Sequence, residues 1–159
     1  GGKYTFLHCT FSNFWSKEKV REQSTVRVNN YYEQTVLPLD SCYFGNCIID
    51  GQLSNELTVD VKNAATYTAN PFFSSCWIRS NADLSDASRY LEIRKSDSPL
   101  EYEDIAAYNF ETKPDENRIK GFTQAKAIAD AGKFPLDIKG NSRNTSISSG
   151  SITVGAYEK

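Results

Sequence analysis

Apolar and polar positions alternate in two kinds of short segment within the first hundred residues. The first kind reads aromatic, two variable residues, Cys, one variable residue, apolar, and it occurs at residues 6–11, 44–49 and 73–78. The second kind alternates apolar with polar or charged residues, at 25–30, 58–63 and 90–95. A period of two in such short segments is typical of β-strands that bury one face.

The two kinds of segment are interleaved and recur at intervals of roughly 30 residues, as expected for one supersecondary unit stacked on itself. Helical repeats are the alternative, but short alternating segments rich in β-branched residues favour strands. We therefore predict an all-β fold, a parallel β-helix of about three to four coils in residues 1–96, in which like residues of successive coils lie on one another.

The spacing also predicts which side chains stack inside. Phe6, Phe44 and Phe73 should form an interior column, and the chain must turn between each Phe and the Cys three residues later, because both face inward. A second interior column should contain the three cysteines of these segments, Cys9, Cys47 and Cys76. We expect buried free thiols there, with a disulfide or a metal site as the alternatives. The residues after these cysteines should face outward: Thr10, Ile48 and Trp77.

The second kind of segment, aligned from residues 25, 58 and 90, places charged residues on its outer face. Arg27, Asp60 and Glu92 should lie there as one ladder on neighbouring coils. Asn30 and Asn63 close two of these segments, and we expect their side chains to stack and to satisfy backbone groups at the turn.

The repeat fades after residue 96, and residues 97–159 are predicted to form an irregular C-terminal cap of the same domain, covering the end of the coils. Ser98 and Glu101 form a capping-box pattern, with Pro99 at the first helical position. The local features expected in this cap are a short helix at 98–107, a loop at 113–117, a helical turn at 123–131 ended by Gly132, and a closing strand at 152–157.

Composition removes some classes of function. The net charge is −2 and no Lys/Arg run occurs, so we expect no nucleic acid as partner. No apolar stretch approaches the roughly 18 residues of a membrane span. The chain contains no Met and begins Gly-Gly-Lys, which suggests a piece of a longer protein.

The stretch at 127–143 reads AIADAGKFPLDIKGNSR, and the chain finishes ITVGAYEK from Ile152. These residues resemble the C-terminal ending of bacterial right-handed parallel β-helix surface proteins of the choice-of-anchor type, in which "LDxxGNxR" precedes a terminal "IGAYE". The resemblance implies a right-handed β-helix on the outside of a Gram-negative bacterium, as a secreted protein or an outer-membrane lipoprotein. It also implies upstream coils of the parent protein as one partner and a surface or dietary polysaccharide as another.

We expect a non-catalytic surface module, used for adhesion or glycan binding or only as the structural end of a longer β-helix. Flat aromatic rings stack on sugar faces, and the candidate ligand-binding residues are Trp15, Tyr31, Tyr32 and Trp77. The competing explanation is that these rings fill corners and loop contacts. No catalytic residue, metal or cofactor is assigned.

The alternative is a fragment of a polysaccharide lyase or glycoside hydrolase, because β-helix folds host both. Such chemistry needs paired carboxylates across a cleft, or acidic Ca²⁺ ligands with a basic residue. Asp60, Glu92 and Arg27 on one outward ladder, with Asp50 nearby, are the candidates. Exposed charges of both signs on a ladder are more often solvated ion pairs.

Overall fold

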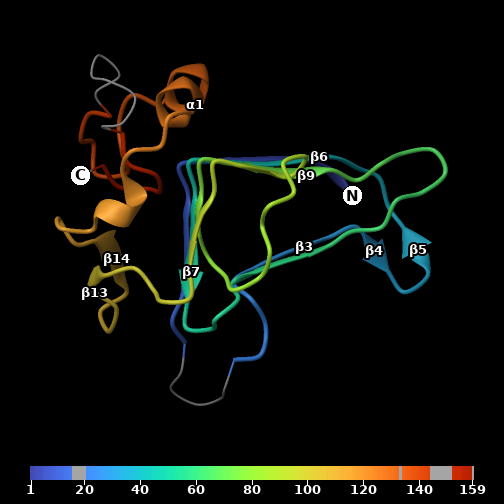
Figure 1. The fold of residues 1–159 in the computed structure, drawn as a ribbon, viewed down its shortest axis with the longest axis horizontal. Helices are drawn as coiled ribbons and strands as arrows, with labels where there is room; N and C mark the ends of the chain where they lie inside the picture. The colour runs from blue at the N-terminus through green and yellow to red at the C-terminus, as the bar shows by residue number, and fades with distance from the viewer. Residues whose placement is uncertain (16–20, 133, 144–151, 159) are drawn as a thin grey trace.

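The computed structural model describes residues 1–15, 21–132, 134–143 and 152–158 (Figure 1). Within these residues the regular structure is almost entirely strand, with a single short α-helix, and the sheets formed between repeats are parallel. The predicted all-β class is therefore confirmed.

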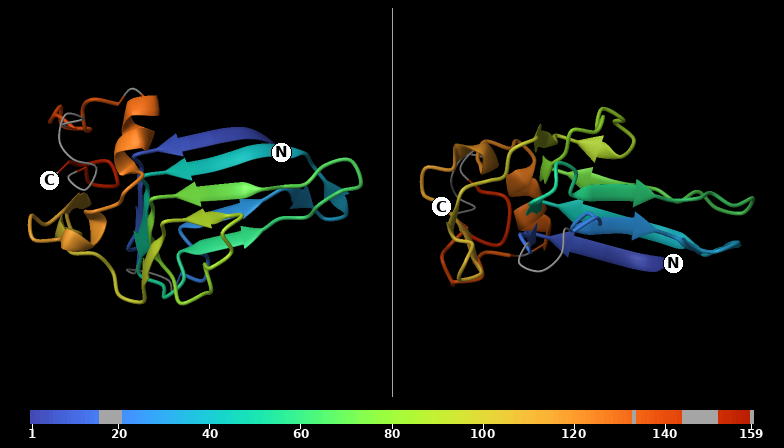
Figure 2. Two further views of the ribbon diagram at one scale, coloured as in Figure 1. Left: turned by 45° about the horizontal axis from the view of Figure 1, so that its top comes forward. Right: turned by 90° about the horizontal axis from the view of Figure 1, so that it is seen from below.

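Strands from successive repeats pair in parallel to form three sheets in the described part of the chain. In Figure 1 these strands largely overlap, and Figure 2 shows them side by side. The first sheet has the order β1 (Gly2–Leu7), β6 (Leu39–Gly45), β9 (Pro71–Ser74), β11 (Tyr90–Leu91). The second has the order β2 (Thr10–Asn13), β7 (Ile48–Gly51), β10 (Trp77–Arg79), β12 (Arg94–Ser96). The third pairs β3 (Val26–Asn29) with β8 (Leu57–Asp60).

The aromatic column predicted from the repeat is confirmed. Phe6 pairs with Phe44, Phe44 with Phe73, and Phe73 with Tyr90 along the first sheet. The ring centroids of the first two pairs are 4.7 Å apart, and those of Phe73 and Tyr90 are 5.5 Å apart. Identical spacing of like residues in a parallel sheet produces this stack, because neighbouring strands lie about 4.8 Å apart.

The cysteine column is also confirmed, as free thiols. The amide of Ile48 donates to the Cys9 carbonyl at 2.8 Å and that of Trp77 to the Cys47 carbonyl at 3.0 Å, so Cys9, Cys47 and Cys76 hold equivalent positions. Cys47 and Cys76 are fully buried. All four cysteines of the chain lie among the described residues, and none forms a disulfide. The thiols act as small apolar side chains between the two sheets.

The predicted corner between aromatic and Cys is a single left-handed residue. His8, Asn46 and Ser75 have φ values of 51°, 52° and 51°, and Glu92 has 54°. Glu92 therefore marks a fourth copy of the first kind of segment, with Tyr90 in the place of Phe. The assignment of residues 90–95 to the second kind was wrong. Both kinds alternate with period two, so alternation alone does not separate them.

The third sheet has a register two residues away from the alignment made on the sequence. Val26 pairs with Leu57 and Val28 with Val59. A shift of two preserves the buried face, so the predicted inward side chains remain correct. Buried Asn30 donates to the Lys62 carbonyl at 2.8 Å and accepts from the Lys62 amide at 2.8 Å. Asn63 is exposed and accepts instead from the Ala69 amide at 3.0 Å, so the predicted Asn stack is wrong.

After β12 the chain forms a hairpin of β13 (Tyr102–Asp104) and β14 (Asn109–Thr112), then a 3₁₀ turn (Asn117–Ile119) and helix α1 (Ala125–Gly132). Helix α1 confirms the predicted helical turn. The helix predicted at 98–107 is wrong, because Leu100 and Tyr102 alternate with exposed residues and contact buried Asp50.

The closing strand predicted at 152–157 is also wrong, since the described residues 152–158 contain no strand. Ile152 and Val154 are nevertheless buried, at 1% and 0% exposure. The amide of Val154 donates to the Ile119 carbonyl at 3.1 Å, and that of Gly155 to the Asn46 carbonyl at 2.7 Å. Successive residues of this segment therefore form hydrogen bonds to different parts of the chain, and not to one neighbouring strand.

The second half of the chain lies beside the repeats and covers the outer face of the second sheet (Figures 1 and 2). Trp77 and Ile48 point out of that sheet into an apolar cluster. Its other members are Leu100, Tyr102, Ile119, Phe122, Ala125, Ala129, Ile152 and Val154. The predicted cap is thus a lateral cover, and the division at residue 96 stays a prediction.

Candidate functional site

The four aromatic candidates for ligand binding fall into different environments. Trp77 is 1% exposed, which contradicts its place on an exposed platform. Alternation correctly placed it on the outer face of the sheet, but the second half of the chain buries that face. Trp15 and Tyr32 are 55% and 74% exposed, and Tyr31 is half-buried.

The exposed candidates do not form one surface. Trp15 follows β2, and its amide donates to Asn13, whose carbonyl accepts from Arg21 in the loop before β3. Tyr31 and Tyr32 form β4, after the end of β3. Strand β3 has four residues, so it spans about 13 Å. Strand β4 (Tyr31–Tyr32) pairs with β5 (Thr35–Val36) in an antiparallel hairpin that projects from the repeats (Figure 1).

The β4–β5 hairpin holds Tyr31 in a defined position. The Tyr31 hydroxyl donates to Asp60 Oδ2, and the Lys62 ammonium lies 3.7 Å from the centre of the Tyr31 ring. Arg27 Nη2 lies 3.1 Å from the same carboxylate oxygen. The hydrogen bond to Asp60 raises the pKa of Tyr31, and the same bond lowers the pKa of Asp60. Asp60 is therefore an exposed carboxylate fixed between a phenol and a guanidinium.

The acidic candidates for catalysis are separated. Asp60 pairs with Arg27 on the third sheet. Glu92 accepts from Ser75 Oγ at 2.6 Å and from the Gln124 amide at 2.9 Å, so it ties a corner to the start of α1. Its predicted place on the ladder with Arg27 and Asp60 is wrong, because Glu92 belongs to the other kind of segment.

Asp50 is fully buried and accepts from the Gly51 and Leu100 amides and the Tyr102 hydroxyl, at 2.7–2.9 Å. Burial raises the pKa of Asp50. Its oxygens join β7 to the second half of the chain. Among the described residues no group of three or more His, Cys, Asp or Glu side chains could hold a metal ion.

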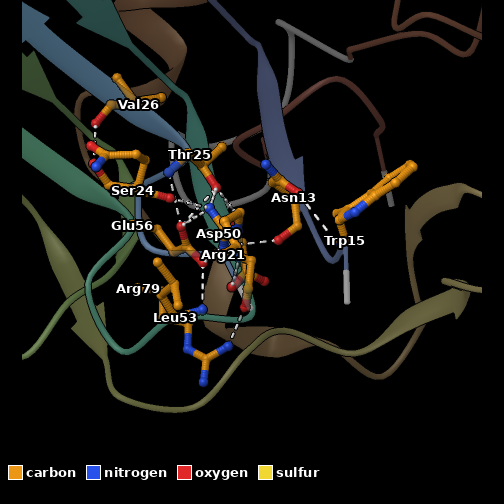
Figure 3. A network of polar contacts seen from close by, with 12 residues as sticks. Asn13, Trp15, Arg21, Ser24, Thr25, Val26, Asp50, Leu53, Glu56 and Arg79 are labelled. Carbon is orange, nitrogen blue, oxygen red and sulfur yellow. Dashed lines mark hydrogen bonds and ion pairs between the residues drawn. The ribbon is translucent and has the colours of Figure 1, made fainter. Parts of the chain in front are cut away.

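A buried charge network that the sequence did not indicate joins residues just before β3 to residues just before β8 (Figure 3). Glu56 is fully buried and forms an ion pair with both terminal nitrogens of Arg21. It also accepts from the Thr25 amide at 2.9 Å, the Thr25 hydroxyl at 2.8 Å and the Leu53 amide at 2.6 Å. These donors occupy the carboxylate, so Glu56 is a structural tie between the loop before β3 and the loop before β8. A glutamate two residues before the predicted segment 58–63 was the only signal in the sequence.

His8 and Cys9 adjoin in sequence but do not form a catalytic dyad. Burial, followed by the charge of Arg143, lowers the pKa of His8 to about 3, so the ring is neutral at pH 7. Asn46 Nδ2, which also donates to the Ala125 carbonyl, lies 3.1 Å from His8 Nε2. The contact with Cys47 and burial raise the pKa of the Cys9 thiol, which disfavours the nucleophilic thiolate.

Comparison of the chain with protein-family models, curated proteins and solved structures gives no match. In the described residues no helix has both the length and the apolar character needed to cross a membrane.

Proposed function

We propose that the chain is the C-terminal part of a right-handed parallel β-helix of three to four coils. The support is the register: three parallel sheets connect successive repeats, and aromatic and thiol columns run between the sheets. Right-handed connections between parallel strands occur in about 98% of cases. The C-terminal residues that resemble choice-of-anchor surface proteins carry the proposed location on the outside of a Gram-negative bacterium.

The proposed activity is non-catalytic contact with a polysaccharide through the β4–β5 hairpin. The observation that carries it is the Tyr32 ring, which is 74% exposed on a hairpin whose other tyrosine is held by Lys62 and Asp60. A flat aromatic ring with few rotatable bonds stacks on a sugar face with little loss of conformational entropy. The Asp60 carboxylate and the Arg27 guanidinium, which lie beside Tyr31, can accept from and donate to sugar hydroxyls.

The test is binding of the whole chain to an array of bacterial-surface and dietary polysaccharides, followed by titration with the best ligand. We expect Tyr32→Ala to weaken binding about five- to thirteen-fold, as removal of a stacking ring worth about 1–1.5 kcal/mol would. Tyr108→Asn is the matched control, because Tyr108 is 66% exposed in the β13–β14 turn and has a positive φ that Asn tolerates. The proposal is contradicted if no polysaccharide on the array binds, or if the two variants lose affinity equally.

A further inference from the structure

We propose that one more coil of the same polypeptide docks on the edge of the first repeat, here called the first-repeat edge. This coil would lead directly into β1, and its strands would pair in parallel with β1, β2 and β3. The first-repeat edge is defined here as the outer edges of these three strands together with the residues 134–138 beside them. The inference rests on the proposed β-helix and adds the place and chemistry of a partner segment.

Equivalent positions become less buried toward this edge. Phe73 and Phe44 are 0% and 2% exposed, whereas Phe6 is half-buried. Cys76 and Cys47 are both 0% exposed, whereas Cys9 is half-buried. On the side of the second repeat, Phe6 and Cys9 have an aromatic and a Cys neighbour, as the other members of their columns do. Their partial exposure therefore measures the missing contact on the other side, which another coil would supply.

The backbone of the first repeat also lacks partners on its outer side. In the described sheets β1, β2 and β3 are all edge strands, each paired on one side only. The right-hand view of Figure 2 shows β1 at the edge of the repeats. Edge strands present unpaired amide and carbonyl groups to a further strand. Three edges at one end of the same repeat fit a coil that contributes three strands.

An inner hollow of about 350 Å³ lies on this edge. Phe6, Phe11, Val26, Val28, Leu39 and Phe44 are among its lining residues. Since successive rings in the column are 4.7 Å apart, a docked aromatic side chain would stack on Phe6 in the same way. The inward residues of the added coil are therefore apolar, with an aromatic over Phe6 and a small residue over Cys9.

An outer groove of about 500 Å³ lies on the other face of β2, between Thr10 and residues 134–138. Phe134, Leu136 and Ile138 line it and are 43%, 54% and 71% exposed. Thr10 continues the outward column of Trp77 and Ile48, which the second half of the chain buries. The next member of that column would lie in this groove, so the added coil carries an apolar residue there.

The left-handed corner residues indicate a polar side chain at the corner of the added coil. Ser75 contacts Glu92 at 2.6 Å, and Asn46 contacts His8 at 3.1 Å, so corner side chains pair along the repeats. Because Asn46 Nδ2 donates to His8 Nε2, the ring proton lies on Nδ1. Nδ1 is buried and has no partner among the described residues. An acceptor at the corner of the added coil would satisfy it.

The entry of the chain favours a covalently continuous coil. The Gly2 amide donates to the Pro38 carbonyl at 2.7 Å, directly before β6 begins. A segment leading into β1 would thus run above the segment that leads into β6. The contact between the added coil and the first repeat would then repeat the contact between the first and second repeats, which pairs Phe6 with Phe44 and Thr10 with Ile48.

The test fuses a second copy of residues 1–38 in front of residue 1, because this length reproduces the spacing from Phe6 to Phe44. We expect one cooperative unfolding transition with a higher urea midpoint, and at least ten-fold slower hydrogen exchange at the edge-facing amides of β1. The control fusion carries Phe6→Asp and Phe11→Asp in the added copy only, and should leave both quantities at their values in the original chain. A fusion with Thr10→Ile in the added copy, as at Ile48, should raise the midpoint further by filling the outer groove.

Equal behaviour of the fusion and its Asp control overturns the inference. Concentration-dependent dimerisation of the original chain, with protection of the same β1 amides, also overturns it, because a second copy would then be the occupant. Neither outcome depends on Tyr32 or on a polysaccharide. If the contacts between Phe6, Phe44 and Phe73 were absent from the original chain, the β-helix proposal itself would fail.

Discussion

Replacement of Phe44 by Ala is expected to lower the free energy of unfolding by about 3–5 kcal/mol. The Phe44 ring is 2% exposed and lies between the rings of Phe6 and Phe73, each 4.7 Å away. Both neighbours are held by parallel strands, so the cavity cannot close by a small shift. Urea denaturation followed by circular dichroism measures the change.

Phe6→Ala is the matched control for Phe44→Ala, because Phe6 belongs to the same column but has a ring on one side only and is half-buried. Its loss should be smaller, about 1–2 kcal/mol, because less apolar surface returns to water. Equal losses in the two variants, or an unchanged midpoint for Phe44→Ala, would remove Phe44 from the interior of the column.

Glu56→Gln is expected to destabilise the chain by about 3–5 kcal/mol, the range for loss of one partner of a buried ion pair. The variant leaves Arg21, whose side chain is 10% exposed, without its counter-charge. The new amide nitrogen also faces donors, since the Thr25 and Leu53 amides already point at the carboxylate. The measurement is again the urea midpoint, at low and at high salt.

Asp60→Asn serves as the control for Glu56→Gln, because it breaks an exposed ion pair whose side chains are 47% and 39% exposed. Exposed pairs contribute about 0–1 kcal/mol and are screened by salt. We expect the Asp60 variant to differ from the parent by no more than this. A Glu56 variant as mild as the Asp60 variant would show that the network in Figure 3 does not hold the loop before β3 to the loop before β8.

The repeat made the interior of the fold predictable from the sequence. A Phe three residues before a Cys, found three times, indicated both columns and the turn between them. The fourth copy was missed because Tyr90 and Ile93 replace Phe and Cys, and because residues 90–95 alternate like the other kind of segment. The pairing of Tyr90 with Phe73 and the left-handed backbone of Glu92 separate the two possibilities.

The second half was less predictable because its contacts are long-range. The pattern of a helix start is present at Ser98, Pro99 and Glu101. The chain is extended there instead, because the Leu100 amide and the Tyr102 hydroxyl donate hydrogen bonds to buried Asp50. Local propensity is a weak prior when a buried carboxylate must be satisfied. For the same reason the candidate site was predicted only in part: the exposure of Tyr32 follows its hairpin, whereas the burial of Trp77 depends on residues 23 or more positions later in the chain.

The central claim is that successive repeats lie on one another in register, with Phe44 between Phe6 and Phe73. Nuclear Overhauser contacts between the aromatic rings of ¹³C-phenylalanine-labelled protein test it most directly. The account predicts contacts from the Phe44 ring to both Phe6 and Phe73, and none directly between Phe6 and Phe73. A Phe44 ring that contacts neither, or only one, would contradict it.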